Sequence, residues 1–197
     1  VGTPVTIAGA YVTGVRPNDG ANRGFHIQED SLEPFSGLFV FTGSLPPSVQ
    51  VGDRVTVIGV YEEFFGVTEV TDPVVLIEDA GNDLPFSPIS VDPGDIANGG
   101  ELAEPYESML VSVGPVEITD ENPDSPDDFD EFAVTGDLRI DDRLTDSVQN
   151  EGLDNNCPAG ESFDDIVGVH FFSFDNFKLQ PRSEDDVIAL GCVPFTP

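Results

Sequence analysis

The chain has 197 residues, of which 38 are acidic and seven are basic, and its formal net charge at pH 7 is −31. Hydrophobic residues make up 39% and include 15 Phe, which is enough for a packed core and argues against a disordered chain. No apolar run approaches the ~18 residues of a membrane-spanning helix, so we expect no membrane insertion. The basic residues are too few for a large phosphate-binding surface, which disfavours nucleic-acid and anionic-membrane partners. The acidic excess favours solubility in salty water, cation binding, or both.

The N-terminal part of the chain predicts a series of short β-strands. Residues 24–30 alternate, with Phe25 and Ile27 on one face and His26 and Gln28 on the other. Turn residues separate the runs at the spacing typical of an all-β sandwich or barrel. The expected strands are 5–15, 24–30, 37–43, 54–66, 67–72 and 73–79.

Strands give way to turn-forming residues in the middle of the chain and then resume. The middle stretch contains GND, SPIS, VDPGD and NGGE, and predicts a linker with one short helical turn around 93–97. A loop at 145–163 interrupts the second series, and its last two strands flank a turn at Asp175-Asn176. The expected strands are 108–120, 131–137, 138–144 and two within 163–187.

Each series matches the five-stranded, partly open Greek-key barrel called the OB-fold. The sequence therefore predicts an all-β protein of two OB-fold-like five-stranded Greek-key barrels in tandem. The expected boundaries are 1–80 for the first barrel, 81–104 for the linker, 105–190 for the second barrel and 191–197 for a C-terminal tail.

Motifs of the common catalytic sites do not occur in the sequence. Gly-x-Ser-x-Gly, the Walker A loop, His-Glu-x-x-His and Cys-x-x-Cys are all missing. Adjacent carboxylates, such as those at 62–63, arise by chance in a chain with 38 acidic residues. We therefore expect a protein that is not an enzyme.

An acidic run is the candidate cation site. Residues 119–131 read TDENPDSPDDFDE, with seven carboxylates in thirteen positions. Ca²⁺ takes six to eight oxygen ligands from flexible loops, so this density suits calcium, although the EF-hand spacing is not met. The alternative is a solvated acidic hairpin tip. The candidate ligands are Asp124, Asp127, Asp128 and Asp130.

Aromatic residues of the first barrel are the candidate ligand face. OB-folds stack single-stranded nucleic acid on aromatic side chains of strands 2 and 3. Phe39 and Phe41, with His26 and Gln28, could form such a face. Alternatively, the two Phe residues point into the core, and Leu38 and Val40 lie under a neighbouring segment. Alternation cannot choose between the two arrangements, because both faces of 37–43 are apolar. In 163–187 the aromatic rings are expected to fill the second barrel and the gap between the barrels.

Cys157 and Cys192 are too few for a disulfide scaffold but enough for one bridge. A bridge between them would close a loop of 36 residues and stabilise the fold by ~3–4 kcal/mol in the chain-entropy model. Two buried free thiols in a cytosolic protein are the alternative.

Several runs together resemble one protein family. GFHIQED, GLFVFTG, VGDRVTVIGVYEEFFGVTEV, YESMLV at 106–111 and FFSFDNFKLQPRSEDDV follow one another in the order found in the OB-fold accessory module of large secreted bacterial nucleases. In that family the module precedes an endonuclease/exonuclease/phosphatase domain, which nothing here matches. The resemblance covers roughly 5–187. It implies a secreted or cell-surface bacterial protein, a Cys157–Cys192 bridge, and a protein partner or a separate catalytic domain.

Three functions are therefore open at this point. The first is a non-catalytic extracellular OB-fold binding or accessory module related to the nuclease-associated modules. The second is a calcium-dependent surface or adhesion protein, in which case Ca²⁺ would be the one cofactor. The third is single-stranded nucleic-acid binding through the aromatic face of strands 2 and 3, which the negative charge opposes.

Overall fold

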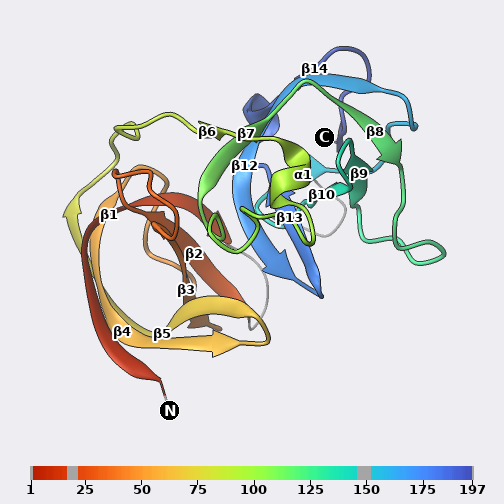
Figure 1. The fold of residues 1–197 in the computed structure, drawn as a ribbon. Coiled ribbons are helices and arrows are strands. Elements are labelled where there is room, and N and C mark those ends of the chain that lie inside the picture. The colour runs from red at the N-terminus through yellow and green to blue at the C-terminus, as the bar shows by residue number, and fades with distance from the viewer. Residues whose placement is uncertain (1, 17–21, 146–151, 197) are drawn as a thin grey trace.

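The structure is a computed structural model that describes residues 2–16, 22–145 and 152–196. It is almost all β, as predicted, and Figure 1 shows its strands gathered into two units. No helix in these ranges is long and apolar enough to cross a membrane.

The first unit is a closed barrel with the strand order β1-β2-β3-β5-β4. All neighbours are antiparallel except β3 and β5, which run parallel, and this gives the Greek-key pattern of an OB-like barrel. The runs 67–72 and 73–79, expected as two strands, form one strand. The bounds are β1 Thr3–Arg16, β2 Arg23–Gln28, β3 Gly37–Gly43, β4 Arg54–Phe64 and β5 Val67–Asp79.

The second unit repeats the same pairing pattern. Strand β8 pairs with β9, β9 with β10, β10 in parallel with β13, β13 with β12, and β12 again with β8. Strands β6 and β7 extend the sheet beyond β12, and β14 pairs with β12. The bounds are β6 Ile89–Ser90, β7 Leu110–Val113, β8 Val116–Asp120, β9 Phe132–Val134, β10 Leu138–Ile140, β12 Ser162–Ser173, β13 Asn176–Gln180 and β14 Val187–Ala189.

Two sequence predictions in this unit need correction. The run 108–120, expected as one strand, is divided into β7 and β8 at Gly114-Pro115, because proline has no N–H to donate to a neighbouring strand. The hairpin between β12 and β13 turns at Phe174 and Asp175, both with positive φ, one residue earlier than predicted.

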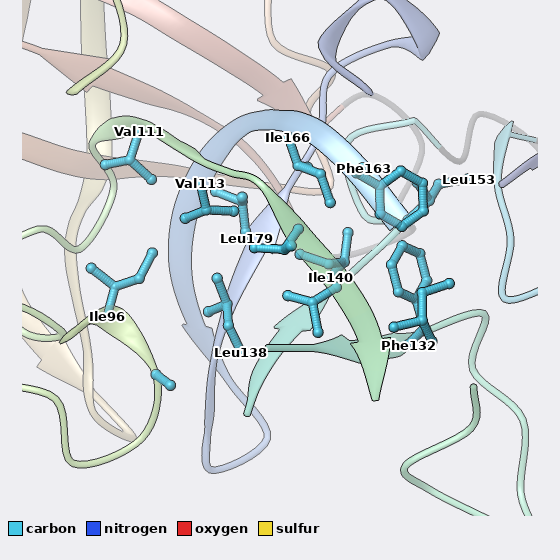
Figure 2. Packing of buried hydrophobic residues seen from close by; sticks show 14 of the residues in the cluster. Ile96, Val111, Val113, Phe132, Leu138, Ile140, Leu153, Phe163, Ile166 and Leu179 are labelled. Atoms are coloured by element: carbon cyan, nitrogen blue, oxygen red, sulfur yellow. The ribbon is translucent and has the colours of Figure 1, made fainter. Parts of the chain in front are cut away.

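Each barrel has its own hydrophobic core. Val12, Phe25 and Val40 are among the fully buried residues of the first. Figure 2 shows the second, in which the Phe132 and Phe163 rings stack with centroids 5.9 Å apart.

The segment expected as a linker is built into the second core. The predicted helical turn is present as α1 (Pro93–Ile96), whose Asp92 cap accepts a hydrogen bond from the Gly94 N–H at 2.9 Å. Ile96 is fully buried in the second cluster, and β6 pairs with β7.

A disulfide bridge attaches the C-terminal segment to the second barrel. Cys157 and Cys192 are bonded, with Cα atoms 5.7 Å apart, which confirms the predicted pair. Beside the bridge, β11 (Gly152–Leu153) pairs with β15 (Phe195–Thr196).

A short 3-10 turn, η1 (Glu184–Asp186), precedes β14, and Arg182 forms an ion pair with Asp186 there at 2.7 Å. Residues 146–151 of the expected loop lie outside the described residues.

Candidate functional site

The face of β2 and β3 in the first barrel is covered by the second barrel. His26 and Gln28 alternate with the core residues of β2, as predicted, yet both are fully buried. The His26 Nδ1 lies 3.2 Å from the Ser108 hydroxyl oxygen, and the Leu110 N–H donates a hydrogen bond to the Gln28 Oε1 at 2.7 Å. Two side chains of the proposed ligand face are therefore part of the contact between the barrels.

Aromatic rings complete this contact. The Phe39 ring points out of the first barrel, since its neighbours Leu38 and Val40 pack on the core, and it is only 2% exposed. It lies between the His26 ring, at 4.9 Å, and the Phe171 ring of β12, at 5.1 Å. A ligand could stack on Phe39 only if the barrels separated.

Phe41, the last residue of the proposed ligand face, and Arg16 lie in different surroundings. Phe41 is half-buried and lies away from the ring cluster. The Arg16 guanidinium lies 4.8 Å from the centroids of both Phe39 and Phe171, a cation–π geometry. Phe171 confirms the expectation that rings of 163–187 fill the gap between the barrels.

The corresponding face of the second barrel is open. In OB-folds the ligand lies on strands 2 and 3, between the loop joining strands 1 and 2 and the loop joining strands 4 and 5. Here these positions fall on β9 and β10, on the acidic loop 121–131, and on the turn at Phe174 and Asp175. A groove of about 450 Å³ occupies this place; we call it the β9–β10 groove. Its lining includes Arg16, Asp124, Asp128, Phe129, Asp130, Glu131, Arg139, Asp141, Asp142, Arg143, Phe174, Asn176 and Lys178.

A buried network of charges forms the floor of the β9–β10 groove. Lys178, the only lysine in the chain, is 2% exposed and forms an ion pair with Glu131. Arg139 on β10 donates hydrogen bonds to Glu131 at 3.1 Å and to Asp124 at 2.6 Å. Asp141 lies 3.9 Å from the Lys178 ammonium. Each charged group has an opposite partner, so the floor holds hydrogen-bond donors and acceptors in fixed positions.

The carboxylates of Glu131 and Asp141 repel each other within this floor. Burial raises the pKa of Glu131, and the nearby Asp141 carboxylate adds to this effect. The Lys178 ammonium and the Arg139 guanidinium act in the opposite direction. Asp141 also accepts a hydrogen bond from the Gln180 amide at 2.8 Å, which fixes its orientation.

Two exposed phenylalanines flank the β9–β10 groove. Phe129 in the acidic loop is 60% exposed, and Phe174 at the tip of the β12–β13 hairpin is 81% exposed. The Phe174 ring centroid lies 5.7 Å from the Lys178 ammonium nitrogen. Large apolar side chains exposed beside fixed polar groups are typical of ligand sites.

The calcium candidates lie on the same acidic loop but do not converge. Asp124 is engaged by Arg139, and Asp128 accepts a hydrogen bond from the Asn155 amide at 2.9 Å. Asp130 has a positive φ, and its N–H donates a hydrogen bond to the Asp128 carboxylate at 3.3 Å. The Asp127 N–H donates a hydrogen bond to the backbone carbonyl of Asp124. Throughout the part of the chain that the structure describes, no group of three or more His, Cys, Asp or Glu is placed to hold a metal ion.

The sequence prediction considered a ligand face in the first barrel alone, so it did not single out Lys178 and Arg139 of the second barrel. Lys178 and Arg139 are 39 residues apart in the sequence, and they lie side by side only because β10 and β13 pair. One signal was available in the sequence: the single lysine of a chain with 38 acidic residues is a candidate for an ion pair.

Comparisons with known proteins add little. No family model matches the chain, and no curated protein matches it. One solved structure, titled "Structure of murine DNA binding protein bound with ds DNA", aligns with 90% of this chain and 92% of that chain at 12% identity, with a TM-score of 0.32. A likeness at this level carries no inference about this chain.

The burial of His26 gives a testable pH dependence. Burial lowers the pKa of His26 well below its usual 6.5, and the Arg16 charge adds to this. In the unfolded chain His26 takes up a proton near pH 6.5, whereas in the native protein it stays neutral, so the stability that it contributes above that pH is lost as the pH falls. We expect the free energy of unfolding of the wild type to fall relative to His26→Phe by roughly 1–2 kcal/mol between pH 7.5 and pH 5.

Urea unfolding of both proteins at the two pH values measures this difference. Other titrating groups are common to both proteins and cancel. A difference in unfolding free energy that does not change with pH would contradict the assignment of His26 as a buried neutral residue.

Proposed function

We propose that the chain is a non-catalytic binding module whose ligand site is the β9–β10 groove. The observation that carries the proposal is that the groove occupies the ligand position of an OB barrel and is lined by fixed charges and exposed rings. The equivalent face of the first barrel is buried against the second. Only the second barrel therefore offers this face to a ligand without rearrangement.

The charges of the groove favour a neutral polar ligand. Six carboxylates and four basic side chains line it, so its balance is negative, and a polyanion would meet repulsion. Carboxylates accept hydrogen bonds from hydroxyl groups, and guanidinium groups donate to them. Phe129 and Phe174 offer apolar surfaces on which the C–H face of a sugar ring can lie. We therefore propose a neutral oligosaccharide, a ligand class that OB-folds are known to bind.

Single-stranded nucleic acid is a second candidate. Four of the seven basic residues of the chain line the groove, and these basic side chains are the feature that favours this ligand. Arg139 and Lys178 already pair with carboxylates, and these carboxylates would compete with phosphate. The oligosaccharide is therefore preferred.

The setting of this module is also part of the proposal. The disulfide fits an oxidising compartment, which supports a secreted or cell-surface protein. The sequence resemblance to nuclease-associated OB modules supports an accessory role beside a protein partner or a separate catalytic domain. In that role the chain would hold its partner close to the polymer that the groove binds.

Removing a flanking ring tests the groove. We expect Phe174→Ala to weaken binding of a neutral oligosaccharide about five- to a hundredfold, because the stacking of a ligand ring on an aromatic side chain is worth ~1–3 kcal/mol and ~1.4 kcal/mol corresponds to a factor of ten. The control is Phe65→Ala, which removes an equally exposed ring from the β4–β5 hairpin of the first barrel. The measurement is binding to an array of neutral oligosaccharides, with an oligothymidylate of fifteen nucleotides as the nucleic-acid probe.

The two candidate ligands give different results in this experiment. Oligothymidylate binding that weakens with salt and is lost in Phe174→Ala would replace the oligosaccharide with nucleic acid. The absence of any binder, or equal behaviour of Phe174→Ala and Phe65→Ala, would contradict the groove as the site.

Thermal melts test the calcium alternative. We expect millimolar CaCl₂ to raise the melting temperature no more than NaCl at the same ionic strength. The reason is that Asp124 and Asp128 are engaged by Arg139 and Asn155, so salt would act only by screening the net charge of −31. An additional rise of several degrees with CaCl₂, reversed by chelator, would instead establish an ion site, since only binding to the native state gives such a shift.

A further inference from the structure

A second cavity, of about 350 Å³, lies where the first barrel meets the segment that precedes β7. It shares no lining residue with the β9–β10 groove. Four glutamates line it, Glu29, Glu63, Glu104 and Glu107, and none of its lining residues is Lys, Arg or His. We call it the glutamate cavity.

Glu107 is the unusual member of this group. It is 5% exposed, and its Oε2 accepts a hydrogen bond from the Thr68 N–H at 3.2 Å. Its Oε1 is buried and has no hydrogen-bond partner among the residues that the structure describes. A buried carboxylate oxygen without a partner is costly, because it has lost its water and gained nothing in return. The side chain lines the glutamate cavity, so a donor bound there would remove this cost.

The neighbours of Glu107 cannot supply that donor. Glu63 accepts hydrogen bonds from the Thr68 hydroxyl at 2.6 Å and from the Tyr61 hydroxyl at 3.2 Å, so the nearby donors are already used. Burial raises the pKa of Glu107 to about 8, with Glu104 and Glu63 adding to the effect and the Thr68 N–H opposing it. A bound group that both donates a hydrogen bond and carries a positive charge would supply the missing partner and would stabilise the ionised carboxylate beside the other glutamates.

The apolar part of the lining indicates the rest of the ligand. Ile7, Ile27 and Leu38 contribute aliphatic walls, and Phe35 and Tyr61 are exposed members of the lining, at 70% and 38%. A short chain of methylene groups that ends in a charged head would match both parts of the cavity. Cation–π attraction to exposed rings favours the same charge.

We infer that the glutamate cavity binds a primary alkylammonium group, whose N–H groups donate to Glu107. A guanidinium gains most from two free carboxylate oxygens in one plane, whereas Glu107 has one, so the single free oxygen favours an ammonium group. The ammonium group is carried by a free alkyl amine or by a lysine side chain of a partner protein. This inference does not depend on the proposed function of the β9–β10 groove.

Titration of the whole chain with n-pentylamine, followed by NMR chemical shifts, tests the inference. We expect saturable binding of n-pentylamine and none of n-pentanol, which has the same shape without the charge. Glu107→Gln keeps the shape of the side chain and removes its charge, and we expect it to weaken binding at least tenfold. The matched control is Glu117→Gln, which removes one charge from an exposed position on β8 and should bind as the wild type does.

The pH dependence gives a second measurement. The ammonium group binds the ionised form of Glu107, so affinity should rise as the pH goes from 6.5 to 8.5, while the amine stays protonated. The other titratable groups that line the cavity are Glu29, Glu63, Glu104 and Tyr61, and Glu107→Gln retains all of them. The rise in affinity should therefore disappear in this variant.

A short peptide with one central lysine separates the two sources of the ammonium group. Binding of n-pentylamine and peptide with similar affinity supports the shared chemistry, and much tighter binding of the peptide supports a protein partner. At pH 8.5, where the Glu107 carboxyl is ionised, Glu107→Gln removes a buried charge, so its melting temperature should be equal to or above that of the wild type, which shows that lost binding is not unfolding. No saturable binding of n-pentylamine at millimolar concentration, or equal binding by Glu107→Gln, would overturn the inference.

Discussion

The ammonium group of Lys178 is buried between Glu131 and Asp141, and this ion-pair network joins β13 to the residues that flank β9 and β10 at the floor of the β9–β10 groove. The chain has seven basic residues for 38 acidic ones, so most carboxylates have no cationic partner. Removing one member of a buried pair leaves an unpaired charge, which is far more costly than the loss of a surface pair. The location of the few cations is therefore informative. Four of them, Arg16, Arg139, Arg143 and Lys178, line the β9–β10 groove.

The exposed ion pairs contribute less to the stability of the fold. Arg54 and Glu78 are joined at 3.0 Å with both side chains partly exposed, and such pairs contribute little. Stability therefore rests on the two apolar cores and on the disulfide, which attaches the C-terminal segment beside the second core. The acidic surface opposes compaction through self-repulsion, and salt should relieve this repulsion.

The two barrels share one pairing pattern but use the same face differently. In the first barrel the β2–β3 face holds His26, Gln28 and Phe39 against the second barrel. In the second barrel the β9–β10 face remains accessible and carries charged groups in place of rings. This asymmetry is the physical basis for proposing a ligand site in the second barrel.

Local sequence pattern predicted much of the fold. Alternation in 24–30 placed Phe25 and His26 on opposite faces correctly, and the disulfide was found from two cysteines. The same alternation could not decide which face of 37–43 points inward, because both are apolar. Phe39 proved to face the second barrel, which is a tertiary contact. The groove was missed because its floor joins Glu131 to Lys178, 47 residues apart, through the pairing of β10 and β13.

The claim that one face is closed and the other open can be tested by amide hydrogen exchange of the intact chain. The Leu110 N–H donates to Gln28 across the contact between the barrels, whereas the Val57 N–H lies inside the first barrel. If the barrels stay joined, Leu110 should exchange as slowly as Val57, through global unfolding alone. Exchange of Leu110 that is orders of magnitude faster would mean that the barrels separate in the native state and expose Phe39, which would contradict the account.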